Sequence, residues 1–300
     1  MVRITYNLDF ILSRLDNIDV LVLRAIEGLM GKFEFVPIEF IESRVRFSSS
    51  SLSKALHKLL DFRLVSRRVG DYTGYGLTFK GLDTLAYHYL KSNGYVAMLG
   101  EKIGVGKEGE VFLGEAPSGE FIVVKFHRGG FSGFRRIRRF RSYSIDAQHS
   151  WLELAKLTGE REFRVLSDLY KIGCRVPKPI AWNRHAVVQE YIDGIDLYKV
   201  GSLDASIASK ILDSIIEDIK IAYQKVRVVH GDLSEYNIMI VESSWDAYII
   251  DWPQYAYRDD ELAESLLRRD VEYILRFFKK KFGVSRDVES TIRIIKGEYS

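Results

Sequence analysis

The chain has few of the features that would place it outside the cytoplasm. It contains a single cysteine, Cys174, so no disulfide can form within it, and the thiol is expected to be a small buried apolar group. No apolar run reaches the roughly 18 residues of a membrane-spanning helix, and residues 1–10 lack the basic and apolar segments of a signal peptide. We therefore expect a soluble, cytoplasmic protein with no membrane partner.

Metal-binding histidine patterns are also missing. The six histidines have no spacing typical of a metal centre, and His57 and His88 fall on expected helices, where surface or packing roles are favoured. Apolar residues make up 47% of the 300 residues, enough for two or three packed domains. A histidine metal site and a largely disordered chain are therefore both disfavoured.

Positive charge is concentrated in two segments, although the net charge is only +3. Residues 46–68 carry six basic residues and one acid, and residues 128–141 carry six arginines and no acid. Phenylalanines interleave with these arginines. Such blocks on a nearly neutral chain favour a polyanionic partner, with a merely solvated charged face as the alternative.

The first ninety residues are predicted to form a winged helix. The first two expected helices lie at 20–30 and at 37–45, with Pro37 in the first turn of the second. The N-cap of the third helix is expected among Ser48 to Ser51. Two strands at 64–69 and 75–79 and a helix at about 80–91 follow. The third helix carries Lys54 and Lys58, and the wing carries Arg67 and Arg68. This placement favours contact with nucleic-acid phosphates, and protein docking is the alternative.

A glycine-rich segment at 104–109 predicts a phosphate-binding loop. Its Gly-x-Gly-x-x-Gly pattern also occurs in dinucleotide-binding folds, but there a helix follows the glycines. Here a strand, a turn at 117–119 and a second strand follow, which is the arrangement of kinases. Lys125 near the end of the second strand is predicted to hold the α- and β-phosphates.

Residues 230–237 read His-Gly-Asp-Leu-Ser-Glu-Tyr-Asn, and Asp251 follows an apolar strand. At these spacings Asp232 is the predicted catalytic group that orients the nucleophile or accepts its proton. Asn237 and Asp251 are the predicted Mg²⁺ ligands, because this ion prefers oxygen donors. The metal and Lys125 would stabilise the transferring phosphoryl group.

The remaining nucleotide contacts are less tightly specified. Glu162 lies on the inward face of an expected helix and is the predicted partner of Lys125, with Glu160 and Glu153 as fallback choices. A strand that ends near Glu190 would lead into a hinge at which adenine bonds the backbone. The full predicted nucleotide site is Ile103, Gly104, Gly106, Lys107, Gly109, Val111, Val123, Lys125, Glu162, Glu190, Ile192, Met239 and Ile250.

The motifs at 103–109, 230–237 and 250–254 resemble a RIO-type atypical kinase of the subfamily with an N-terminal winged helix, and residues 74–79 resemble that subfamily's wing-to-helix segment. The resemblance covers essentially the whole chain. It implies an α+β fold in which the winged helix precedes a bilobal, truncated kinase-like fold. It also implies ATP with Mg²⁺ (or Mn²⁺ as a substitute), autophosphorylation, and transient phosphorylation of the aspartate matching Asp251.

The predicted domains are a winged helix at 1–93, a kinase N-lobe at 94–189 with an arginine-rich insertion at 127–159, and a C-lobe at 190–300. Ser142 and Ser144 in the insertion are candidate autophosphorylation sites, with a simple polar loop as the alternative.

Three departures from ordinary protein kinases argue against control by a phosphorylated activation loop and against a general platform for protein substrates. Gly231 replaces the arginine that would pair with a phosphorylated activation loop, and Ser234 stands where many kinases carry a lysine. The segment after Asp251 lacks Ala-Pro-Glu, and 258–282 is expected to form one amphipathic helix instead of a peptide platform. Trp252 stands where the family more often has phenylalanine.

The expected function, with the ribosomal role implied by the family resemblance, is that of an ATP/Mg-dependent serine/threonine kinase or ATPase that matures the precursor small ribosomal subunit and binds its RNA, with a protein substrate also considered. The chain is expected to be a monomer. The alternative is a small-molecule phosphotransferase of the aminoglycoside or choline kinase type, which shares His-Gly-Asp but not the glycine segment or the winged helix. A catalytically inactive nucleic-acid-binding regulator is disfavoured, because Lys125, Asp232, Asn237 and Asp251 are all present.

Overall fold

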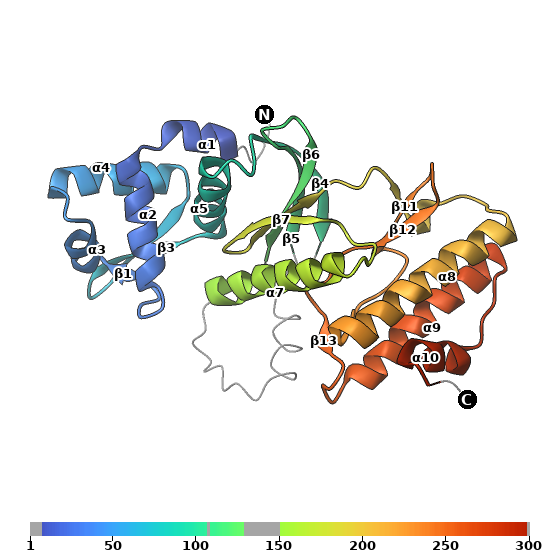
Figure 1. Cartoon of the computed structure of the whole chain (residues 1–300). Helices are drawn as coiled ribbons and strands as arrows, with labels where there is room; N and C mark the ends of the chain where they lie inside the picture. Colours follow the sequence, from blue (N-terminus) through green and yellow to red (C-terminus); the bar gives the residue numbers. More distant parts are fainter. Residues whose placement is uncertain (1–7, 107–108, 129–150, 299–300) are drawn as a thin grey trace. The chain divides into compact units, whose positions relative to one another are not determined.

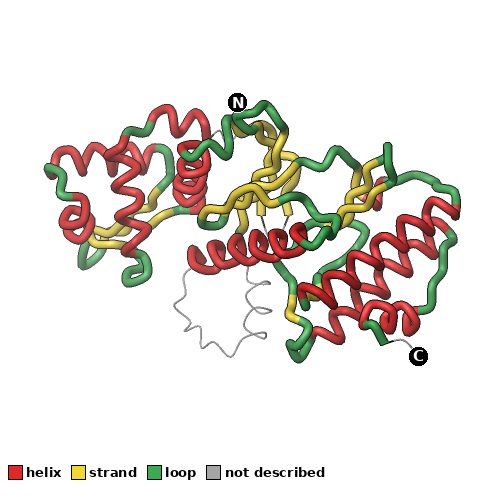
Figure 2. Tube along the Cα trace, viewed as in Figure 1, coloured by secondary structure: helices red, strands yellow, loops and turns green. Residues whose placement is uncertain are grey.

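The computed structural model describes residues 8–106, 109–128 and 151–298, and these form two compact units (Figures 1 and 2). The first unit contains the helical N-terminal segment and a five-stranded sheet, and the second contains most of the chain after residue 188. Helix α7 (Trp151–Lys171) contributes its first part to the first unit and its remainder to the second. Within the described ranges, no helix combines the length and the apolar character needed to cross a bilayer.

Residues 8–93, called here the helical subdomain, form a winged helix. Its elements are α1 (Leu8–Arg14), α2 (Asn17–Leu29), β1 (Val36–Pro37), α3 (Ile38–Val45), α4 (Ser49–Asp61), β2 (Val65–Val69), β3 (Thr73–Leu77) and α5 (Phe79–Ser92). The strands form a sheet of order β1-β3-β2. The sequence did not predict α1 or β1, and Pro37 lies at the N-cap of α3 instead of in its first turn.

Side-chain caps explain where the helices of this subdomain begin. Ser48 accepts a hydrogen bond from the N–H of Ser51 at 3.2 Å, which confirms the predicted cap of α4. Asp16 and Asp19 form a capping box at the start of α2. Lys58 on α4 donates to both of these carboxylates, at 3.0 and 2.6 Å. Lys58 is therefore a structural residue, whereas Lys54 on the same helix is exposed.

The five-stranded sheet carries the glycine segment. Its strands are β4 (Met98–Gly106), β5 (Gly109–Glu115), β6 (Phe121–His127), β7 (Pro179–Asn183) and β8 (Ala186–Glu190), in the order β4-β5-β6-β8-β7. One continuous apolar core joins this sheet to the helical subdomain. The subdomain contributes Leu23, Leu56, Leu82 and Leu85, and the sheet contributes Phe112, Ile122, Val124, Phe126 and Val188.

Two carboxylates of the helical subdomain also bind polar groups of the adjoining structure. Asp9 on α1 accepts a hydrogen bond from the backbone N–H of Leu99 on β4 at 3.1 Å. Glu27 on α2 pairs with Arg184 in the β7–β8 turn at 2.7 Å and with Lys156 on α7 at 3.0 Å. Polar contacts thus reinforce the apolar packing between the helices and the sheet.

A third carboxylate, Asp83 on α5, is completely buried beside His185. His185 Nε2 lies 2.6 Å from Asp83 Oδ1, and the guanidinium of Arg128 binds both carboxylate oxygens. Burial alone would raise the pKa of Asp83, but the hydrogen bond from His185 and the charge of Arg128 lower it below its usual value. Burial lowers the pKa of His185, against the opposing effect of Asp83.

These shifts predict a loss of stability in mild acid. The unfolded chain takes up a proton at His185 below about pH 6.5, whereas the folded chain does so only at lower pH. The free energy of unfolding therefore keeps its full contribution from His185 above about pH 6.5. Below that pH the contribution decreases by up to about 1.4 kcal/mol for each unit by which the pH falls. Asp83 adds a loss in the same direction at still lower pH. Thermal unfolding between pH 7.5 and 5 should show this decline. The matched variant His185→Gln keeps a donor without titrating and should show a smaller slope; an equal slope would contradict the assignment.

Among the described residues, the second unit contains two small sheets, three complete α-helices and the remainder of α7. Its elements are β9 (Ile195–Asp196), the 3₁₀ turn η1 (Leu197–Lys199), α8 (Ala205–Ile221), the π-helical turn η2 (Ala222–Val226), β10 (Val228–Val229), β11 (Ile238–Val241), β12 (Asp246–Ile249), β13 (Ala256–Tyr257), α9 (Ala263–Phe282) and α10 (Val288–Lys296). Strands β12, β11 and β9 form one sheet, and β10 pairs with β13.

Two expectations about this unit have clear outcomes. The helix predicted at 258–282 starts five residues later, at Ala263, because Asp260 accepts a hydrogen bond from the N–H of Tyr257 and holds a turn there. Cys174 is buried, as predicted, and burial raises the pKa of its thiol to about 12. The α+β class is confirmed, and the domain boundaries proposed from the sequence stay predictions.

Candidate active site

The described glycines of the 104–109 segment, Gly104, Gly106 and Gly109, lie on two antiparallel strands, as predicted. Gly106 at the end of β4 pairs with Gly109 at the start of β5, and the two strands are antiparallel. A Cβ at position 109 would lie 2.6 Å from the carbonyl oxygen of Phe126, so close packing against β6 requires glycine there. This glycine therefore has a structural reason that is independent of any phosphate.

Three predicted site residues form a row across the hairpin and its neighbour. Gly104 on β4 pairs with Val111 on β5, and Val111 pairs with Lys125 on β6. Directly paired residues lie on the same face of a sheet, and a Cβ at position 104 would lie 3.5 Å from the Cβ of Val111. Val123 lies two residues before Lys125 and shares this face. Lys125 itself is only 8% exposed.

Ile103 and Glu162 differ in how their positions agree with the prediction. Ile103 is the extra residue of a β-bulge between the pairs at 102 and 104, and its side chain is half exposed. Glu162 on α7 is completely buried, whereas the fallback residues Glu160 and Glu153 are partly buried and exposed. Burial thus favours Glu162 among the three glutamates, and its pairing with Lys125 stays a prediction.

His230 ties the two predicted acidic segments together in the second unit. Its Nδ1 accepts a hydrogen bond from the N–H of Asp232 at 3.3 Å, and its Nε2 lies 3.0 Å from the carbonyl oxygen of Ile250. A neutral ring with the proton on Nε2 satisfies both contacts. The loop that presents Asp232 is thus fastened to the residue immediately before Asp251.

Asn237 makes the second link between these segments. Its side-chain Nδ2 donates to the carbonyl of Asp232 at 2.8 Å, and its own carbonyl accepts from the N–H of Ile250 at 2.9 Å. Because Nδ2 is the donor, Oδ1 is the side-chain atom suited to a cation. The predicted metal ligands Asn237 and Asp251 are therefore held on adjoining, mutually bonded backbone segments.

Asp251 lies in a left-handed backbone conformation, with φ of 65°. Aspartate tolerates this conformation better than most residues do. The next residue, Trp252, is buried, and its indole N–H donates to the carbonyl of Ile249 at 3.1 Å, which closes a tight turn around Asp251. The fold thus accommodates tryptophan and uses its polar atom to shape the turn.

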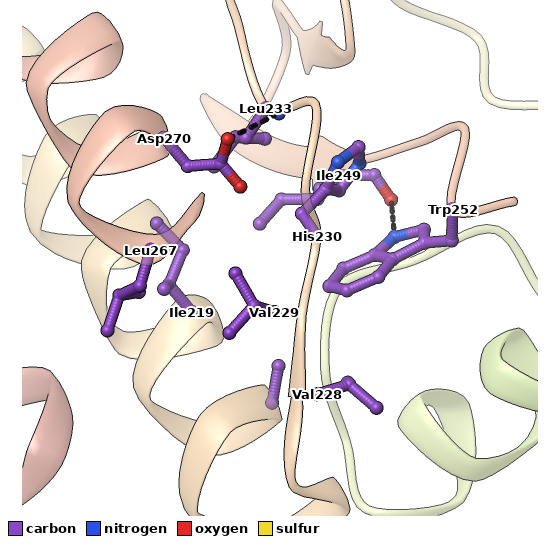
Figure 3. A pocket seen from close by; sticks show the side chains of 10 residues that line it. Ile219, Val228, Val229, His230, Leu233, Ile249, Trp252, Leu267 and Asp270 are labelled. Carbon is purple, nitrogen blue, oxygen red and sulfur yellow. Dashed lines mark hydrogen bonds between the residues drawn. The ribbon is translucent and has the colours of Figure 1, made fainter. Parts of the chain in front are cut away.

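Asp270 on α9 anchors the catalytic loop, and sequence reasoning missed it. Its carboxylate accepts hydrogen bonds from the N–H groups of Gly231 at 2.7 Å and Leu233 at 3.3 Å. Figure 3 shows Asp270 facing Leu233 from α9, with His230 and Trp252 on the other side of the loop. Burial raises the pKa of Asp270, against opposing interactions that include the neighbouring Arg269. The available signal was an acidic residue on the apolar face of an amphipathic helix.

The conformation of this anchored loop explains why residue 231 is a glycine. It has φ of 79°, and a Cβ there would lie 2.7 Å from the carbonyl oxygen of Gln254. Its own carbonyl accepts a hydrogen bond from Arg269, next to the anchor. An arginine at 231, as in ordinary kinases, would therefore require a different loop path.

A small cavity of about 10 Å³ lies under the same loop. It is lined mainly by apolar side chains of α8, β10 and α9, together with His230, Trp252 and Asp270 (Figure 3). A cavity of this size holds at most about one water molecule. It is too small for a nucleotide and belongs to the packing beneath the loop.

Glu190 and Ile192, the residues whose backbone is predicted to bind adenine, already make some local hydrogen bonds. The N–H of Glu190 donates to the carbonyl of Lys178 at 2.9 Å, and its carboxylate accepts from the N–H of Lys178 at 3.1 Å. Ile192 is buried, and its carbonyl accepts from Gly194. Met239 on β11 and Ile250 are partly buried. Lys107, Ser142, Ser144 and the arginine block after residue 128 lie outside the described residues.

Comparison with known proteins agrees with this geometry. Residues 12–93 match the N-terminal domain of Rio2, and residues 110–291 match the RIO domain. A RIO-type serine/threonine-protein kinase Rio2 of Methanocaldococcus jannaschii is 37% identical, over 84% of this chain and 92% of the relative. The serine/threonine-protein kinase rio2 of Schizosaccharomyces pombe is 31% identical, over 93% and 81%.

Solved structures give the same result. The crystal structure of the Rio2 kinase-ADP/Mg²⁺-phosphoaspartate complex from Chaetomium thermophilum has a TM-score of 0.78 and 31% identity, over 93% of this chain and 86% of that one. The two matched family regions include most of the helical subdomain and the anchored catalytic loop, and the glycine segment at 104–109 lies between them. The chain therefore belongs to the Rio2 family of RIO-type serine/threonine-protein kinases.

Proposed function

We propose that this chain binds ATP with Mg²⁺ and transfers the γ-phosphoryl group, acting as a kinase or ATPase in the maturation of the small ribosomal subunit. The observation that carries the catalytic part is the pair of links, through His230 and Asn237, that hold the Asp232 and Asp251 segments together. The family of the chain and the ADP/Mg²⁺-phosphoaspartate complex of its structural neighbour support the same chemistry.

Each predicted residue has a role that its chemistry supports. Lys125 would bind the α- and β-phosphates, and Glu162 would orient that lysine. Asn237 through Oδ1, and Asp251 through one carboxylate oxygen, would hold Mg²⁺, which neutralises charge on the phosphates. Asp232 would orient the attacking group and accept its proton.

Asp251 would also accept the phosphoryl group transiently. Its second carboxylate oxygen attacks the γ-phosphorus, the bond from that phosphorus to the β–γ bridging oxygen breaks, and ADP leaves. The product is an acyl phosphate, and attack by water or by a serine or threonine hydroxyl, with its proton passing to Asp232, restores the carboxylate. The sharp turn closed by Trp252 supports this role, because it fixes the carboxylate-bearing residue between two bonded neighbours.

The local hydrogen bonds of Glu190 and Ile192 indicate which of their backbone groups could bind adenine. Because the N–H of Glu190 already donates to Lys178, its carbonyl is the group suited to accept a bond from the adenine amino group. The carbonyl of Ile192 already accepts from Gly194, so its N–H is the group suited to donate to the ring. Val111, Val123, Met239 and Ile250, with Ile103 at the bulge, would supply apolar contacts.

The proposal is tested by incubating the purified chain with γ-labelled ATP and Mg²⁺. We expect release of labelled phosphate together with protein-bound label that hydroxylamine removes, because acyl phosphates react with that nucleophile. A chain that neither hydrolyses ATP nor acquires label would contradict the proposed function. Label stable to hydroxylamine would instead contradict the aspartyl intermediate and leave hydroxyl phosphorylation as the reaction.

The RNA partner is proposed from the exposed cations of the helical subdomain. Lys54 on α4 and Arg67 on β2 are exposed, whereas Lys58 is committed to the cap of α2. These side chains can contact phosphates without reading base edges. The proposed polyanion is the RNA of the precursor small subunit.

Binding to a short RNA duplex should weaken steeply as salt increases. Because each phosphate contact releases about one counterion, Lys54→Ala should reduce the slope of log affinity against log salt by about 1. Lys171→Ala, which removes an exposed lysine from α7, is the matched control and should leave the slope unchanged. An RNA affinity that is equal at about 50 mM and about 200 mM salt would contradict an electrostatic RNA surface.

A further inference from the structure

Arg128, immediately after β6, joins the glycine hairpin to the helical subdomain. Its Nη1 donates to Asp83 Oδ1 at 2.6 Å, and its Nη2 donates to Asp83 Oδ2 at 2.8 Å and to Glu110 Oε2 at 2.6 Å. Asp83 is completely buried, and the side chains of Arg128 and Glu110 are 19% and 21% exposed. A two-pronged arginine–carboxylate pair fixes direction as well as distance. The position of Glu110 is thus defined relative to α5.

Glu110 lies beside the Gly106–Gly109 pair of the glycine hairpin. It is the residue after Gly109, and its Oε1 accepts a hydrogen bond from Lys102 on β4. It also pairs along the backbone with Phe126 on β6. One carboxylate therefore connects β4, β5 and, through Arg128, the end of the strand that carries Lys125. Movement of the hairpin as a body requires this carboxylate to move or its bonds to break.

The other side of Arg128 is enclosed by the helical subdomain and α7. The guanidinium lies 5.1 Å from the ring centre of Phe79 at the start of α5, and that ring lies 4.1 Å from the ring of Trp151. A cation over an aromatic face is attracted to it. Asp83 is held further by His185. The arginine therefore has little freedom to follow the hairpin if the hairpin shifts.

We propose that Arg128, Glu110 and Asp83 form a positioning relay, in which the helical subdomain fixes the glycine hairpin over the nucleotide and so contributes to ATP affinity. The inference rests on the proposed ATP-binding function. None of the three residues is assigned a contact with the reacting atoms. Since the hairpin would bind the phosphates equally before and during transfer, loosening it should raise KM for ATP and leave kcat nearly unchanged.

The test uses conservative variants of the full chain. Glu110→Gln removes the charge that Arg128 and Lys102 share, and we expect KM for ATP to rise by about threefold to tenfold, as for the loss of one hydrogen bond of typical net strength. Glu115→Gln, at the opposite end of β5, is the matched control and should change KM by less than about twofold. A purely structural role would lower kcat through loss of folded enzyme and leave KM unchanged.

A double-mutant cycle with Asp83→Asn tests the coupling between the subdomain and the hairpin. If both residues act through Arg128, the double variant should raise KM no more than the stronger single variant. Arg128→Lys replaces Asp83→Asn if that variant does not fold, because it keeps the positive charge and loses the two-pronged contact.

The outcomes separate the relay from the proposed function. Unchanged KM in Glu110→Gln, or effects that multiply in the double variant, would overturn the relay. Raised KM with constant kcat and non-multiplying effects would support it. Absence of ATP turnover in the wild-type chain would contradict the proposed function itself.

Discussion

Replacing Asp251 with asparagine is expected to reduce ATP turnover by at least about a hundredfold. The substitution removes a negative charge from the proposed metal site and the oxygen nucleophile proposed to accept the phosphoryl group. It preserves the size of the side chain, and asparagine also tolerates the left-handed conformation that residue 251 adopts. The measurement is release of labelled phosphate at saturating ATP over a range of Mg²⁺ concentrations.

Two further variants make this result specific. Asp232→Asn should lose turnover to a similar extent, as expected for removal of a general base, about 10²–10⁴-fold, while retaining the Mg²⁺ dependence of ADP binding. Asp246→Asn changes an exposed aspartate at the start of β12 and is the matched control. Full turnover in Asp251→Asn or Asp232→Asn, with normal Asp246→Asn, would refute the assignment of the catalytic residues.

Asp270→Ala is expected to destabilise the second unit by about 3 kcal/mol and to remove most of the ATP turnover. The change leaves the buried N–H groups of Gly231 and Leu233 without their acceptor and deprives Arg269 of a neighbouring carboxylate. The loop that presents Asp232 then loses its fixed path. Thermal unfolding monitored by circular dichroism, together with turnover at a temperature where the variant is folded, measures both effects.

Asp270→Asn is the matched variant for this anchor. Its amide oxygen can accept a hydrogen bond from one of the two N–H groups, but its NH₂ group cannot accept from the other. The free energy of unfolding of Asp270→Asn should therefore lie between the values of the wild type and of Asp270→Ala. Equal melting temperatures for all three proteins would show that the carboxylate does not anchor the loop.

The parts of the site that the sequence predicted are those determined by neighbouring residues. The glycine pattern and the turn at 117–119 indicated antiparallel strands around the glycines followed by another strand, and the observed pairing places Gly104, Val111 and Lys125 in one row. The spacing from Asp232 to Asn237 is short enough for a single loop to determine its geometry. Local constraints of this kind leave a pattern in the sequence.

The parts that were missed depend on partners far away in the chain. Asp270 binds residues 37 and 39 positions earlier, and Lys58 pairs with Asp19 across 39 positions. Neither pairing produces a periodic signal, so Lys58 was assigned to phosphate contact although it binds the capping carboxylates Asp16 and Asp19 of α2. The late start of α9 has a similar cause, because the Asp260 turn overrides an amphipathic pattern that extends upstream.

The apolar core shared by the helical subdomain and the five-stranded sheet has a consequence for how this chain can change over generations. Leu82 and Leu85 of α5 belong to the same cluster as Phe112 and Ile122 of the sheet. Exchange of the helical subdomain for an unrelated module would expose one half of that cluster and leave the other half without its complement. The two parts must therefore be inherited together, and a substitution in one is accepted only when the other can adjust its packing.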